Sequence, residues 1–207
     1  MNTRGYWVGF SMLLATAGPA AAQAVTIAPP GAYRTAAAYR LRKPQPAGTD
    51  AFYPDKRGQL VVEVPRGTKT VKQRVAPDSV WGYTSGKGRT FRLHRGEEYR
   101  LEFADTLCVY SSNTTPAKAA GDAAVAAGPG GGRTIGATRY FFSRGLTGLV
   151  FPLTVRYLRD MYEASNPAFV AALGQLRLGQ SLTDVDRKTG LFRVTTLYRE
   201  AAGEEKP

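Results

Sequence analysis

Three basic side chains close together in the sequence are the best candidates for chemistry in this chain: Arg92, His94 and Arg100. If neighbouring strands place them on one polar face, their N–H groups could bind an anionic group. Arg92 and Arg100 would then be direct cross-strand neighbours, and like charges in that position repel each other. Glu98, opposite His94, and Glu102 could instead neutralise this face from within. The sequence therefore leaves two interpretations, an anion-binding site or an internally satisfied ladder of charges.

Four acidic residues in turn-like settings are the only other candidates for catalysis: Asp50, Asp55, Asp184 and Asp186. Glycoside hydrolysis requires a pair of carboxyl groups about 5–10 Å apart. Nothing in the sequence brings any two of these residues together across a cleft. A carboxylate-based hydrolase is therefore the weaker alternative to a protein without catalytic activity.

Other catalytic chemistry is not indicated. Cys108 is the single cysteine and His94 the single histidine, so the sequence offers neither a Cys/His zinc cluster nor a second histidine for a triad. The glycine run at residues 128–132 is not followed by the Gly-Lys-Ser/Thr of a phosphate-binding loop. We therefore expect no catalytic residue set, no metal site and no cofactor. Cys108 is expected to act as a small buried hydrophobe.

The three basic candidates lie within residues 80–111, where the odd-numbered positions are mostly apolar. Such alternation is typical of strands with one buried face. It predicts a four-strand antiparallel meander with turns centred on Lys87, Gly96 and Asp105, joined by loops of three or five residues rather than two. The predicted apolar row across the sheet contains Tyr83, Phe91, Leu101 and Val109. The opposite face, expected to be exposed to solvent, holds Thr90, Arg92, His94, Glu98, Arg100 and Glu102.

Further strands are expected on both sides of this meander. Residues 59–64 are rich in β-branched side chains and predict a strand, and residues 70–75 predict a weaker one. Residues 139–143 (RYFFS) predict another strand, which could return to pair beside residues 107–111.

Short helices are expected near the end of the chain. Thr154 and Asn166 are typical N-cap residues, and Asn166 is followed by a proline at the first helical position. Residues 191–200 favour a helix narrowly over a strand. The predicted fold class is α+β, an antiparallel β-meander of about six strands, which could form a partly closed barrel, followed by short C-terminal helices.

The first 24 residues predict a signal peptide. Arg4 precedes an apolar stretch at residues 6–17, and Ala22-Gln23-Ala24 offers small residues for cleavage after Ala24. An N-terminal membrane anchor is the alternative. We expect an exported protein, periplasmic or secreted, with no transmembrane segment in the mature chain.

The mature chain is expected to contain one domain at residues 59–200. An irregular lead-in would precede it at residues 25–58, and a frayed tail would follow at residues 201–207. Residues 112–138 are rich in Ala and Gly and lack large apolar side chains, which predicts a flexible insertion.

The strong positive charge is uneven along the sequence. The chain carries 28 Lys and Arg against 16 Asp and Glu, a formal net charge of +12, and residues 34–100 hold fifteen basic and six acidic side chains. Such a surface suits anionic lipid, glycan or polymer, and export favours these partners over nucleic acid. A solvated surface that aids solubility without binding a partner is the other interpretation.

The order of motifs is similar to that of a known group. A WGY strand, an FRL strand, a VYS strand and a YFFS strand, followed by FPLT and paired short helices, resemble uncharacterised exported proteins of Gram-negative bacteria over roughly residues 61–198. The resemblance implies export and a sheet followed by helices, but no activity. Taken together, the sequence predicts an exported, non-catalytic envelope protein that binds or scaffolds a partner not yet identified.

Overall fold

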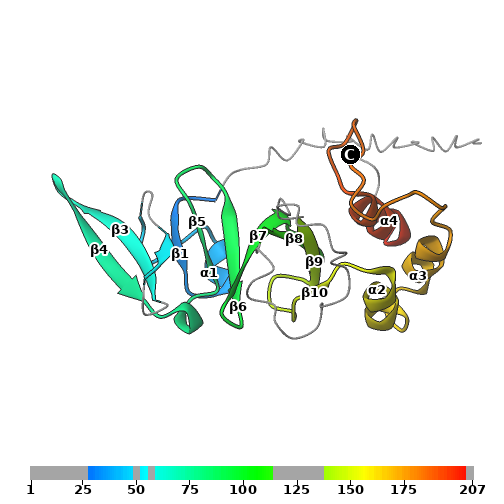
Figure 1. Cartoon of the computed structure of the whole chain (residues 1–207), viewed down its shortest axis with the longest axis horizontal. Helices are drawn as coiled ribbons and strands as arrows, with labels where there is room; N and C mark the ends of the chain where they lie inside the picture. Colours follow the sequence, from blue (N-terminus) through cyan, green and yellow to red (C-terminus); the bar gives the residue numbers. More distant parts are fainter. Residues whose placement is uncertain (1–27, 49–51, 56–58, 114–137, 204–207) are drawn as a thin grey trace, which may run out of the picture.

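The computed structural model describes residues 28–48, 52–55, 59–113 and 138–203. In this part of the chain a small antiparallel sheet lies at one end of an elongated molecule, a larger sheet lies in the middle, and three helices lie at the other end (Figure 1). The predicted signal peptide and nearly all of the predicted insertion lie outside the described residues.

The larger sheet has seven strands in the order β1-β5-β6-β7-β8-β9-β10, and every neighbouring pair is antiparallel. The strands are β1 (Gly31–Tyr33), β5 (Gly82–Thr84), β6 (Thr90–His94), β7 (Glu97–Phe103), β8 (Leu107–Ser112), β9 (Arg139–Arg144) and β10 (Phe151–Pro152). The edge strands β1 and β10 do not pair with each other, so the sheet is open. The α+β class is confirmed, whereas the suggestion of a partly closed barrel is wrong.

The smaller sheet has the order β2-β3-β4, formed by β2 (Tyr53–Pro54), β3 (Leu60–Arg66) and β4 (Lys69–Val75). A two-residue turn, with Gly67 at φ 61°, joins β3 to β4. Both strands were predicted, although β3 continues through Pro65 to Arg66. The expected irregular lead-in, by contrast, contains β1, β2 and the short helix α1 (Ala36–Arg40).

The three C-terminal helices are α2 (Val155–Tyr162), α3 (Pro167–Gly174) and α4 (Arg193–Ala201). The side chain of Thr154 accepts a hydrogen bond from the backbone N–H of Tyr157, and that of Asn166 accepts one from the N–H of Phe169. Both predicted N-caps and the helical assignment of residues 191–200 are confirmed. These helices have eight or nine residues, and no helix in the described residues could cross a bilayer.

The strands of the predicted meander are present, but their register differs from the prediction after the first turn. Tyr83 pairs with Phe91 as expected. Between β6 and β7, however, Phe91 pairs with Arg100 and Arg92 pairs with Tyr99, a shift of one residue. The turn between these strands is the two-residue pair Arg95-Gly96, with φ values of 54° and 75°, as in a type I′ hairpin. A two-residue loop pairs odd with even positions, so the expected apolar row is broken.

Pairing between β7 and β8 also departs from the prediction. Leu101 pairs with Tyr110, Phe103 pairs with Val109, and a bulge lies between these two positions of β7. The strand β9 lies beside β8 as the sequence suggested.

Both faces of the larger sheet carry a packed interior, although Glu98 and Arg100 of β7 stay exposed, and this explains how the new register is accommodated. One face packs against the smaller sheet through Ala32, Val80, Tyr83, Leu60 and Val62, and farther along against helices α2–α4. The other face forms a second interior, the loop-side core, whose buried members are Ala28, Tyr33, Ala36, Trp81, Tyr99, Cys108, Tyr110 and Leu146. Of the six side chains expected to face solvent, Thr90 and Arg92 are buried, whereas Glu98 and Arg100 are exposed.

Cys108 belongs to the loop-side core and is fully buried. Burial raises the pKa of its thiol, and the S–H group donates to the carbonyl of Asp105 at 3.1 Å. We predict that Cys108 of the folded protein resists a thiol reagent such as Ellman's reagent, and that its reaction follows global unfolding in urea. Rapid, complete labelling of the folded protein in buffer without denaturant would contradict this placement.

Candidate functional site

The structure does not bring the three predicted anion-binding residues together. Arg92 and Arg100 point to opposite faces of the sheet, because Arg92 pairs with Tyr99 and Arg100 with Phe91. Arg100 is exposed and forms an ion pair with Glu102 at 3.4 Å, so only this part of the predicted charge ladder is present. The prediction that Arg92 and Arg100 are cross-strand neighbours is wrong, because the two-residue turn shifts the register by one residue.

His94 is half-buried at the rim of a cavity of about 190 Å³, which Arg95 and Asp78 also line. Burial is the main cause that lowers the pKa of His94 below its usual value, and the positive charges of Arg92 and Arg95 lower it further. Glu98, the expected partner of His94, instead accepts a hydrogen bond from the hydroxyl of Tyr83 at 2.6 Å.

Arg92 is only 3% exposed and holds a polar cluster inside the loop-side core. Its Nη1 donates to Tyr110 Oη at 3.0 Å and to Ser143 Oγ at 3.1 Å, and its Nη2 donates to the carbonyl of Gly148 at 2.6 Å. The guanidinium carbon lies 5.7 Å from the centroid of the Tyr110 ring. Desolvation raises the pKa of Tyr110 to about 12, so its hydroxyl stays protonated at neutral pH.

This cluster fastens the loop between β9 and β10 onto the sheet. Trp81 Nε1 donates to the carbonyl of Leu146 at 2.6 Å, and Ser143 Oγ donates to that of Gly145, also at 2.6 Å. Together with the bond from Arg92, three backbone carbonyls of one loop are held by side chains. A buried carbonyl without a partner is costly, so these bonds make the loop part of the interior. Arg92 is therefore a structural residue and does not form an open binding surface.

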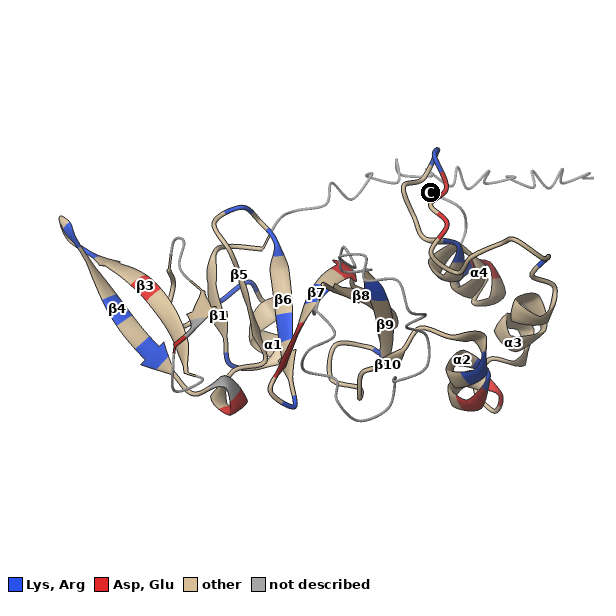
Figure 2. Cartoon of the chain, viewed as in Figure 1, with Lys and Arg blue, Asp and Glu red and all other residues tan. Residues whose placement is uncertain are grey.

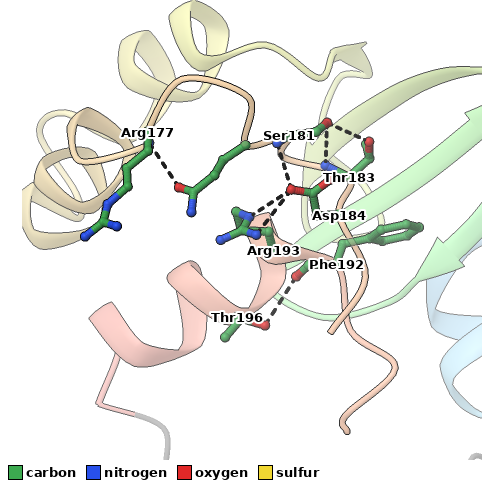
Figure 3. Close-up of polar contacts among 8 residues, drawn as sticks. Arg177, Ser181, Thr183, Asp184, Phe192, Arg193 and Thr196 are labelled. Atoms are coloured by element: carbon green, nitrogen blue, oxygen red, sulfur yellow. Dashed lines mark hydrogen bonds and ion pairs between the residues drawn. The ribbon is translucent and has the colours of Figure 1, made fainter. Parts of the chain in front are cut away.

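The three described acidic candidates for hydrolysis each stabilise a local turn. Asp55 accepts from the N–H of Gln59 and from Nε of Arg74, and Asp186 accepts from the N–H of Lys188. Asp184 accepts from the N–H of Ser181 and pairs with Arg193 at 3.2 Å (Figure 3). Asp50 lies outside the described residues.

These carboxylates also lie in different parts of the fold. Asp55 follows β2 at one end of the molecule, whereas Asp184 and Asp186 lie in the loop before α4 at the other end (Figure 1). The arrangement places Asp55 far from the other two. Over the ranges that the structure describes, no group of three or more His, Cys, Asp or Glu side chains is placed to hold a metal ion.

A polar cavity lies where the two sheets meet, and we call it the junction pocket. Its volume is about 410 Å³, and it is lined by Arg34, Gln45, Pro46, Gln73, Arg74, Val75, Ala76 and Ser79. Sequence reasoning missed this site because its residues come from separate segments that only the fold brings together. The only sequence signal for a site in this region was the excess of basic residues at positions 34–100.

The segment containing Gln45 and Pro46 is held against the edge strand β1. The N–H of Ala32 donates to the carbonyl of Pro46 at 3.0 Å, and the N–H of Gln45 donates to the carbonyl of Ala32 at 2.6 Å. Arg34 follows β1 directly, and its carbonyl accepts from the N–H of Trp81. Backbone hydrogen bonds thus position one wall of the junction pocket, and β4 supplies the other.

The charges around the junction pocket are unequal. Nε of Arg74 donates to Asp55 at 3.1 Å, so a carboxylate offsets this guanidinium. Arg34 is exposed and has no carboxylate partner among the described residues. The net positive charge of the pocket therefore comes mainly from Arg34, while its two carboxamides and the hydroxyl of Ser79 provide neutral hydrogen-bonding groups.

The wider surface around the pocket is basic, and we call the described residues up to position 95 the basic half. In the described residues up to position 95, twelve Lys and Arg side chains accompany three acidic ones, Asp55, Glu63 and Asp78. Arg92 alone among these twelve is buried; the exposed ones are Arg34, Arg40, Arg42, Lys43, Arg66, Lys69, Lys72, Arg74, Lys87, Arg89 and Arg95. Figure 2 shows basic residues at the tip of the β3–β4 hairpin, along β4 and at the loop between β5 and β6. The helical end carries both signs of charge.

The fold and this surface define an α+β protein with a basic half and a polar pocket between two sheets. No family model, no curated protein and no solved structure matches the chain. The resemblance to exported proteins of Gram-negative bacteria thus stays a prediction.

Proposed function

We propose that this protein is an exported, non-catalytic binding protein of the cell envelope, and that its basic half binds an anionic envelope component. The observation that carries the proposal is the one-sided charge: eleven exposed basic side chains against three acidic ones in the described residues up to position 95. Exposed charges of one sign raise the local concentration of oppositely charged groups and speed association with them. Anionic lipid, glycan or polymer would each meet this requirement.

We propose a protein without catalytic activity because the candidate side chains make structural contacts. Arg92 is occupied by three hydrogen-bond acceptors in the interior. Each described carboxylate among the hydrolase candidates is engaged in a local turn or an ion pair. A carboxylate-based hydrolase needs one acid and one base facing a common cleft. The position of Asp55 at the opposite end of the molecule from Asp184 and Asp186 argues against such a pair between them.

The test is the salt dependence of binding to two anionic probes, immobilised heparin and vesicles containing phosphatidylglycerol. We expect retention on both at low ionic strength and progressive release as salt rises toward 0.5 M, because salt screens contacts between exposed charges. Vesicles of phosphatidylcholine alone serve as the uncharged control. If the protein binds neither anionic probe at low salt, the basic half is only a solvated surface and the proposal fails.

A further inference from the structure

We infer that the junction pocket binds one sugar unit that carries a single anionic group. This inference rests on the proposed function and names the chemical class of ligand for the pocket within the basic half. The volume of about 410 Å³ lies within the range of roughly 300–1,000 Å³ that is usual for small-molecule sites. It is therefore suited to one compact unit and not to a long segment of polymer.

The charge of the pocket selects for one anionic group. Arg74 is already paired with Asp55, so a second anion beside it would meet a carboxylate. Arg34 has an exposed guanidinium without a carboxylate partner in the described ranges, and its planar donors match a carboxylate or a phosphate. A ligand with one anionic group satisfies Arg34, whereas a ligand with several clustered charges would also face Asp55.

The neutral lining selects for hydroxyl groups. Gln45 and Gln73 each offer both donor and acceptor atoms, which is the chemistry that sugar hydroxyls require. The hydroxyl of Ser79 donates to the carbonyl of Ala76 at 2.7 Å, so its oxygen adds an acceptor. Pro46 and Val75 provide apolar surface for the carbon atoms of a ring. A free inorganic anion would use only Arg34 and would leave these groups to water.

The test is an NMR titration of the full mature chain with methyl glucuronide and with glucose 6-phosphate, which distinguish a carboxylate from a phosphate source. Acetate, inorganic phosphate and methyl glucoside are the matched fragments. At least one anionic sugar is expected to bind about tenfold more tightly than its free anion and than methyl glucoside. If neither anionic sugar exceeds its fragments, the inference is overturned.

Two variants locate the binding. Arg34→Gln is expected to weaken binding of the preferred anionic sugar about tenfold, since a charged hydrogen bond is lost. Gln73→Leu should weaken binding of the anionic sugar and leave the affinity for the free anion unchanged. The matched control is Arg89→Gln, which removes one exposed positive charge outside the pocket lining and should change affinity less than twofold.

Equal affinities for Arg34→Gln and Arg89→Gln would overturn the pocket as the binding site. Retention on heparin or anionic vesicles in that case would leave the proposed function standing. If the unmodified chain is retained neither on heparin nor on anionic vesicles, the proposed function itself is contradicted. Melting temperatures of the variants verify that each one is folded.

Discussion

Replacing Arg92 with alanine is expected to lower the free energy of unfolding by about 3 kcal/mol. The substitution removes a long side chain from a packed interior and leaves a cavity. It also takes the donor from the buried hydroxyl of Tyr110 and from the carbonyl of Gly148. For a protein of this size we expect a fall in melting temperature of about 6–12 °C. The measurement is urea denaturation followed by tryptophan fluorescence.

Two further variants separate the contributions of volume and hydrogen bonding. Arg92→Met fills most of the space but supplies no donor, so part of the stability should return. Arg89→Ala is the matched control, because Arg89 is exposed just before β6 and its loss should cost less than about 0.5 kcal/mol. Equal stabilities for Arg92→Ala and Arg89→Ala would mean that Arg92 lies in water, and the description of the loop-side core would be wrong.

The order of elements could be predicted from local signals, because these signals act over a few residues. Thr154 and Asn166 satisfy the free N–H groups at helix starts, and β-branched side chains mark β3. The narrow preference of residues 191–200 for a helix agrees with α4. Such features depend little on what packs against them.

The faces of the larger sheet could not be predicted, because alternation identifies a buried face only when the other face is wet. Here both faces carry a packed interior, so Tyr99 and Tyr110 lie in one interior while Tyr83 lies in the other. The turn Arg95-Gly96 then decides the register, and its one-residue shift places Arg92 and Arg100 on opposite faces instead of on one shared face. The predicted anion site was lost with that shift.

The junction pocket was beyond sequence reasoning for a different reason. Its walls combine Arg34 after β1, the segment at Gln45 and the end of β4 at Gln73, and only tertiary packing makes them neighbours. The general excess of positive charge in this half could be read from the sequence. Which of those charges remain exposed required the structure.

Reversing two charges at the tip of the β3–β4 hairpin is expected to weaken binding to anionic vesicles at least tenfold. Arg66 and Lys69 flank the turn, and both are exposed in the basic half. Each basic residue near an anionic surface contributes roughly 1 kcal/mol, and a glutamate in its place adds repulsion. Both positions lie outside the packed cores, so we expect little change in stability.

The most direct test of the account compares Arg66→Glu/Lys69→Glu with Arg187→Glu/Lys188→Glu. Each pair reverses one arginine and one lysine in an exposed turn, but the second pair lies at the helical end of the molecule. Affinities for phosphatidylglycerol vesicles and for heparin are measured at the same low ionic strength. We expect the hairpin pair to lose at least tenfold in affinity and the helical-end pair to lose less than threefold. Equal losses from both pairs would show that net charge alone governs binding, and would contradict a binding surface in the basic half.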